Sequence, residues 1–141
     1  MEPISSIPDP RSHVVEARRR VLAAIAAWRE AGRDAARDEL GAALSELAGA
    51  LSRLFAEEED EVHSPILTGQ HPQIALEAYR LVQEHRELSA ECDRLARTAH
   101  QQDPGPLDAA VVAFIARLAE HDRAENHLFF ESYWHDSGPI D

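Results

Sequence analysis

The chain has 141 residues and a formal net charge of −12, because 14 basic side chains, all of them arginine, face 26 acidic ones. This negative charge argues against nucleic acid or an anionic membrane as a partner, and the lack of lysine excludes chemistry that needs a side-chain amine. One cysteine excludes an intrachain disulfide and, with a polar start that has no apolar run, leads us to expect a cytoplasmic protein without a membrane span.

Four long segments rich in alanine, leucine, arginine and glutamate follow one another along the chain, separated by glycine and proline. These residue types have high helix propensities, and none of the segments alternates polar and apolar residues with a period of two. The sequence therefore predicts four helices and no strand, with the helices covering roughly residues 11–31, 36–63, 72–100 and 106–134.

Apolar residues recur three and four positions apart in each predicted helix, as in the series Leu40, Leu44, Leu47, Leu51 and Leu54. This spacing places the side chains on one face, and four such faces with short connections favour an up-down-up-down four-helix bundle. We expect an all-α fold in one domain that spans residues 1–141. Residues 1–10 form an irregular lead-in and residues 135–141 an irregular tail in this prediction.

Polar residues that interrupt or extend the apolar series are informative, because burying an unpaired polar group costs free energy. His85 fills the gap in the third series between Leu81 and Leu88. His121 and Glu125 continue the fourth series and, being four residues apart, share one helix face. The full set predicted to face the core is His13, Glu58, Glu61, His85, His121 and Glu125.

The depth of these residues in the bundle can be compared, because residues at one level of a helical hairpin are mirror images about its turn. The midpoint between His13 and Glu58 falls at positions 35–36, that between Glu58 and His85 at 71–72, and that between His85 and His121 at 103. Each midpoint lies within a few residues of a predicted turn. An error of three residues in a midpoint would shift the relative level by about six residues, or about 9 Å.

A group of three imidazoles and three carboxylates at one depth has few stable fates, since buried charges must pair or coordinate a metal. This donor set suits one or two transition-metal ions, iron or manganese before zinc. The alternatives for single features are a packed core histidine at His85 and a solvated acidic face at residues 57–61. The alternative for the whole set is a metal-free domain with a buried hydrogen-bonded network.

Three stretches of the chain are similar to a known family. They are HVVEARRRVLAAI from His13, EHREL at 84–88 and LAEHDRAENHLFF at 118–130. In their order and spacing they resemble the hemerythrin-like (HHE cation-binding) domain family over nearly the whole chain. The resemblance implies a four-helix bundle around a non-haem di-iron centre that reacts with dioxygen.

The second predicted helix departs from the family pattern, because it has no histidine where the family has HxxxE. Its apolar series favours Glu58 and Glu61 as the ligands, with Glu57 in reserve. Ser89 also stands where oxygen-carrying members have a further histidine. Carboxylate ligands stabilise ferric and higher states of iron, so this balance favours oxygen activation over reversible carriage.

The resemblance and the ligand balance together predict two iron ions, bridged by oxo and carboxylate groups, with manganese or zinc as alternatives. The predicted chemistry is of the oxidase, oxygenase or peroxidase type, with dioxygen or peroxide as the ligand and an electron donor that the sequence does not identify. No catalytic residue beyond the metal centre is predicted. A non-catalytic module that binds or senses dioxygen, nitric oxide or iron is the alternative.

Overall fold

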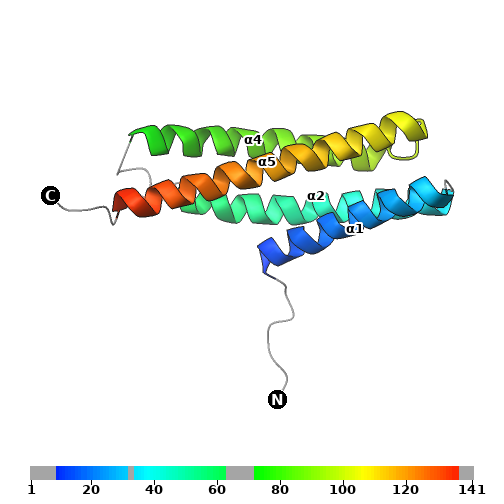
Figure 1. The fold of residues 1–141 in the computed structure, drawn as a ribbon, viewed down its shortest axis with the longest axis horizontal. Coiled ribbons are helices and arrows are strands. Elements are labelled where there is room, and N and C mark those ends of the chain that lie inside the picture. Colours follow the sequence, from blue (N-terminus) through cyan, green and yellow to red (C-terminus); the bar gives the residue numbers. More distant parts are fainter. Residues whose placement is uncertain (1–8, 32–33, 63–71, 137–141) are drawn as a thin grey trace, which may run out of the picture.

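The computed structural model describes residues 9–31, 34–62 and 72–136. They form four helices and, within these ranges, no strand: α1 (Pro10–Ala31), α2 (Asp34–Val62), α4 (Pro72–Thr98) and α5 (Pro104–Asp136). Each bound lies within two residues of the predicted one. The helices pack side by side as an up-down-up-down bundle in which α1 covers only part of the length of α2 and α5 (Figure 1). The predicted all-α four-helix architecture is thereby confirmed.

Proline marks the start of α1, α4 and α5, at Pro10, Pro72 and Pro104. This position suits proline because the first backbone N–H groups of a helix have no partner within the helix. At α1 the preceding Asp9 accepts a hydrogen bond from the backbone N–H of Ser12, at 3.3 Å. Such a cap satisfies one of the free N–H groups at the helix start.

The apolar faces of all four helices meet in one large core cluster, which contains Leu44 and Leu51 of α2, Leu88 of α4, and Phe114 and Leu118 of α5. A second, smaller cluster lies toward the opposite end of α4 and α5 and consists of Ile74, Ala78, Leu81 and Leu128. Between these two apolar clusters α4 and α5 bury polar residues instead. His85 and His121, two of the polar residues that the sequence predicts to face the core, therefore form a layer within the bundle.

Arg37 of α2 contacts both α1 and the α4–α5 connection at one end of the bundle. Its Nη1 donates to the backbone carbonyls of Ala99, at 3.1 Å, and Gln102, at 2.9 Å. Its guanidinium group also lies 4.8 Å from the ring centroid of Trp28 in α1. The arginine thus satisfies carbonyls of the connection that follows α4, which no helix hydrogen bond would pair.

The predicted single domain over 1–141 is not tested by the structure and stays a prediction. Of the predicted lead-in and tail, residues 1–8 and 137–141 lie outside the described residues. α1 starts at Pro10 and α5 continues to Asp136, so the helices extend slightly into both predicted irregular ends. None of the four described helices is both long and apolar enough to cross a membrane.

Candidate metal centre

Three polar side chains are buried in the part of the chain whose side chains the structure describes: Glu58 on α2, His85 on α4 and His121 on α5. Their exposed fractions are 4%, 2% and 2%. Each takes a position in the helical series that would otherwise hold an apolar residue, which is why all three face inward. The bundle therefore encloses two imidazoles and a carboxylate between its two apolar clusters.

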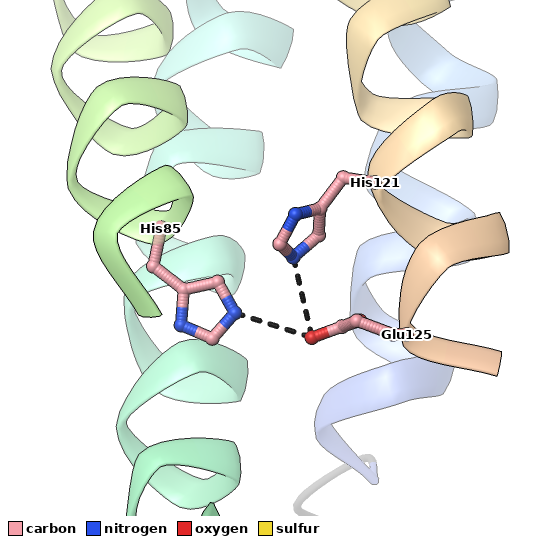
Figure 2. Close-up of side chains that lie close together, drawn as sticks. All are labelled: His85, His121 and Glu125. Atoms are coloured by element: carbon pink, nitrogen blue, oxygen red, sulfur yellow. Dashed lines mark hydrogen bonds and ion pairs between the residues drawn. The ribbon is translucent and has the colours of Figure 1, made fainter. Parts of the chain in front are cut away.

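The two histidines point their Nε2 atoms at the same oxygen of Glu125 (Figure 2). His85 Nε2 lies 3.1 Å and His121 Nε2 3.2 Å from Glu125 Oε2. His121 and Glu125 come from successive turns of α5, and His85 reaches them from α4. The three side chains offer ligand atoms that all lie within 4.8 Å of one another, which is the arrangement of a site that could hold a metal ion.

Glu58 adds a second carboxylate to this group from α2. Its Oε1 lies 3.5 Å from His85 Nε2, and its carboxyl group is also hydrogen-bonded to Glu125. Two carboxyl groups so close together are stable only with a shared proton or a cation between them. The donors that the structure brings together are therefore two imidazoles and two carboxylates.

The outward-facing nitrogen of each histidine is held by a further carboxylate. His85 Nδ1 lies 3.1 Å from Glu59 Oε2, and His121 Nδ1 lies 2.5 Å from Glu84 Oε1. An Nδ1–H that donates to a carboxylate leaves the lone pair of Nε2 directed inward. Histidines that bind metals show this pattern almost always, because the outer carboxylate fixes the tautomer and the orientation of the ring.

The charged forms of His121 and Glu125 stabilise each other. Burial disfavours the imidazolium form, but the carboxylates of Glu125 and Glu84 outweigh burial and raise the pKa of His121. Burial would also raise the pKa of Glu125, yet interactions with His121, His85 and Glu58 hold that pKa well below its usual range. A proton on His121 therefore balances part of the carboxylate charge, which a bound cation would also do.

The fit of a metal ion is supported by one further atom. His121 Nε2 is buried and lies 3.2 Å from Glu125 Oε2, but the two atoms are not aligned as a hydrogen bond. A buried ring nitrogen without an aligned hydrogen bond is costly in a metal-free core. Two imidazoles with nearby carboxylates are the donor set of many non-haem iron sites, so the residues present fit iron.

Comparison with known families gives one match. The model of the hemerythrin HHE cation-binding domain matches residues 11–133. The chain belongs to this family. Neither the curated proteins nor the solved structures gave a match. The predicted family membership is thereby confirmed, and with it the binding of iron or another metal cation as the coarse function of the domain.

His13, predicted to be the ligand that α1 contributes in this hemerythrin-family domain, does not reach the cluster. Its Nε2 lies 3.6 Å from Glu46 and its Nδ1 3.4 Å from Arg53, both on α2. The reason is the position of the first turn: α1 ends at Ala31 and α2 starts at Asp34, about three residues before the assumed midpoint. That difference moves His13 along α2 by about six residues, or about 9 Å, away from Glu58.

The other predicted residues of α2 divide between described and undescribed positions. Glu58 joins the cluster as predicted, whereas Glu57, held in reserve, is exposed. The side chain of Glu61 lies outside the described residues, so its part in the site stays a prediction. The structure thus brings together four of the six predicted residues, and metal ligation by those four also stays a prediction.

Three residues near the cluster were missed by the sequence analysis. Phe55 stacks on His85 with ring centroids 3.9 Å apart and an angle of 4° between the ring planes. Glu59 holds His85 Nδ1, and Arg11 of α1 places Nη2 3.5 Å from Glu58 Oε2. Phe55 follows the apolar Leu54 and Glu59 follows Glu58, so an inward face slightly wider than one series would have included both.

Two described residues of types that often react in metalloproteins, Tyr79 and Cys92, take no part in the cluster. Tyr79 is 59% exposed on α4, so its hydroxyl is not enclosed with the histidines. Cys92 is buried in the core, where its Sγ donates to the carbonyl of Leu44 at 3.5 Å. Burial raises the pKa of the Cys92 thiol to about 12, so it stays protonated and unreactive at neutral pH.

Proposed function

We propose that the chain is a non-haem iron protein that binds and activates dioxygen or a reactive derivative such as peroxide. The observation that carries the proposal is the convergence of His85 Nε2 and His121 Nε2 on Glu125, with each Nδ1 held by a separate carboxylate. When bound, iron supplies a Lewis acid that can change its oxidation state. Its proposed ligands are Glu58, His85, His121 and Glu125.

The side chains around the cluster have separate tasks in this proposal. Glu58 and Glu125 would neutralise the charge of the metal, and Glu59 and Glu84 would keep the imidazoles in the ligating tautomer. Phe55 covers the face of His85 and keeps water from that side of the cluster. A dry site strengthens the electrostatic interactions within it.

We propose two iron ions, of which the described donors account for one. A second ion would be held by the carboxylates of Glu58, Glu125 and Glu61. Manganese and zinc are the alternative metals, because the same nitrogen and oxygen donors bind them. An oxidase role also needs an external electron donor. The free and buried Cys92 supports placing the protein in the reducing cytoplasm.

The metal centre is tested by the iron content of protein purified from iron-replete cells. We expect one to two iron ions per chain by mass spectrometry and a steep loss of iron in His121→Ala. The matched control is His100→Ala, since His100 is exposed near the end of α4 and contacts Asp38 instead of the cluster. Equal iron content in the two variants would contradict the proposed ligands.

A non-catalytic role in binding or sensing dioxygen, nitric oxide or iron is the second candidate. The enclosure of the cluster favours it, because His85 and His121 are each 2% exposed and admit only small ligands. Turnover of peroxide, or of dioxygen with an added reductant, by the iron-loaded protein would support catalysis. Rapid and reversible binding of one dioxygen per site without turnover would support the second candidate instead.

A further inference from the structure

A cavity of about 230 Å³ lies beside the candidate metal centre, where α1 begins against α2 and α5. Two of the proposed ligands, Glu58 and Glu125, form part of its wall. α1 starts part-way along the bundle (Figure 1). Its first turns contribute Arg11, Val14 and Arg18 to the lining of the cavity. A molecule bound there would lie next to the metal-facing carboxylates.

The lining of this cavity combines guanidinium and carboxylate groups with apolar surface. Arg11 and Arg18 of α1 contribute guanidinium groups, and Val14 and Leu54 contribute buried aliphatic side chains. Arg18 Nη2 donates to Asp122 at 2.7 Å, while its Nε is buried and makes no hydrogen bond to any described residue. Guanidinium groups suit carboxylates because their donors are fixed in a planar fork.

The charge of the lining depends on whether a metal is bound. Two arginines face three carboxylates, Glu58, Asp122 and Glu125, so the lining by itself has one net negative formal charge. A divalent cation on Glu58 and Glu125 changes this to one net positive charge. Charges interact more strongly in a partly enclosed site than in bulk water. The lining would therefore favour binding of an anion after metal loading and disfavour it before.

We propose that this cavity binds a small monocarboxylate with a short apolar chain, and that it does so only when the metal centre is loaded. The inference rests on the proposed function, because the loaded cluster supplies the positive charge. The carboxylate of the ligand contacts Arg11 and Arg18, and its chain packs on Val14 and Leu54. Binding of metal and of the carboxylate is therefore coupled, and each increases the affinity for the other.

The test uses manganese(II) as a divalent metal and butyrate as the carboxylate. Manganese content is measured first, and butyrate is then titrated into loaded and metal-free protein by calorimetry. We expect binding about tenfold tighter to the loaded protein, a factor common for coupled sites. Broadening of the butyrate proton resonances by manganese would place the ligand beside the metal. 1-Butanol, which has the chain without the charge, is expected not to bind.

Variants separate the role of the cavity from direct binding to the metal. Arg18→Gln should weaken butyrate binding about tenfold at unchanged manganese content, whereas Arg19→Gln, on the exposed face of α1, should leave it unchanged. Asp122→Asn removes a negative charge and frees the guanidinium of Arg18, so it should tighten binding. This gain of affinity cannot result from misfolding.

The outcomes distinguish this inference from the proposed function. Protein that retains no manganese or iron would overturn both. If loaded protein binds butyrate no better than metal-free protein, the proposed carboxylate site is wrong and the metal centre is unaffected. Equal affinities in Arg18→Gln, Asp122→Asn and the unchanged chain would do the same, since the arginine-lined cavity would then not hold the carboxylate.

Discussion

At the scale of single residues, the outward nitrogen of each site histidine distinguishes this cluster from a pair of packed core histidines. A core histidine needs one hydrogen-bond partner, whereas His85 and His121 each have a carboxylate at Nδ1 and another at Nε2. The acidic groups come from three helices, so the bundle accumulates negative charge around the two imidazole rings. Such an excess of carboxylates is what a bound cation would stabilise.

The outer carboxylates are expected to tune metal affinity without binding the metal. In Glu84→Gln the charged partner of His121 Nδ1 is replaced by a neutral amide, so we expect metal affinity to fall about 10- to 100-fold. Competition with a chelator of known affinity measures the change. Glu120→Gln is the control. Glu120 directly precedes His121 and lines the same pocket as Glu84 and His121, but it is exposed. Similar losses in both variants would point to general electrostatics instead.

Phe55 is expected to stabilise both the fold and the ring of His85. Phe55→Ala would remove a buried ring that stacks on His85, and it should lower the free energy of unfolding of the metal-free protein by about 3 kcal/mol. Urea denaturation followed by circular dichroism measures the loss. Phe130→Ala is the control, since Phe130 is 60% exposed and should change stability by less than about 0.5 kcal/mol.

At the scale of the helices, the length of the connections decides which side chains meet. The α1–α2 connection is so short that His13 lies opposite the Glu46 to Arg53 part of α2, and Arg11 instead reaches Glu58. Helices α4 and α5 are registered so that His85 meets Glu125 and His121 meets Glu84. The contribution of α1 near the cluster is therefore a guanidinium group and not an imidazole.

Arg37 is expected to hold the end of the bundle opposite the cluster. Arg37→Ala would remove two hydrogen bonds to the carbonyls of Ala99 and Gln102 and the contact with Trp28, so stability should fall by about 2 kcal/mol. Arg37→Lys should recover only part of this, since an ammonium group lacks the planar fork. Thermal and urea denaturation measure both.

The control for Arg37 is Arg97→Ala. Arg97 is 70% exposed and pairs with Asp93 on its own helix, and such surface pairs contribute about 0.3 to 0.5 kcal/mol. A loss in Arg97→Ala as large as that in Arg37→Ala would mean that the fixed contacts of Arg37 add nothing to stability.

At the scale of the whole molecule, the buried charges make the stability of the metal-free protein depend on pH. The pKa of His121 is raised above 6.5, so the stabilisation from its charged form is complete below pH 6.5 and is lost as pH rises through the raised value. The pKa of Glu125 is lowered from 4.5, so its stabilisation is complete above pH 4.5 and is lost in more acidic solution. We expect chelator-treated protein to melt at its highest temperature between pH 4.5 and 6.5.

The stabilisation that bound metal provides should increase as pH rises, because imidazoles bind metals only when deprotonated. The difference in melting temperature between loaded and metal-free protein is expected to grow from about pH 5.5 to about pH 7.5. Calorimetric scans of both forms measure the difference. A difference that stays constant with pH would contradict ligation by His121 and His85.

The helices and much of the cluster could be predicted from the sequence, because both follow from a local period. Helix-forming segments separated by glycine and proline predicted each helix to within two residues at either bound. Apolar residues three and four positions apart then selected Glu58, His85, His121 and Glu125. Glu59 and Phe55 were not predicted, since each sits one position from a series residue. Their roles appear only when a neighbouring helix supplies the side chain that they contact.

By itself the sequence determined which side chains face the interior, since a helix face depends only on the spacing along one chain segment. It also determined that acidic side chains and histidines, with no lysine to balance them, would meet there. The tertiary structure alone decided which of these residues meet at one depth. The residues of two helices that lie at the same depth depend on the length of the connection and on packing. At the first turn a shift of about 9 Å places Arg11, and not His13, beside Glu58.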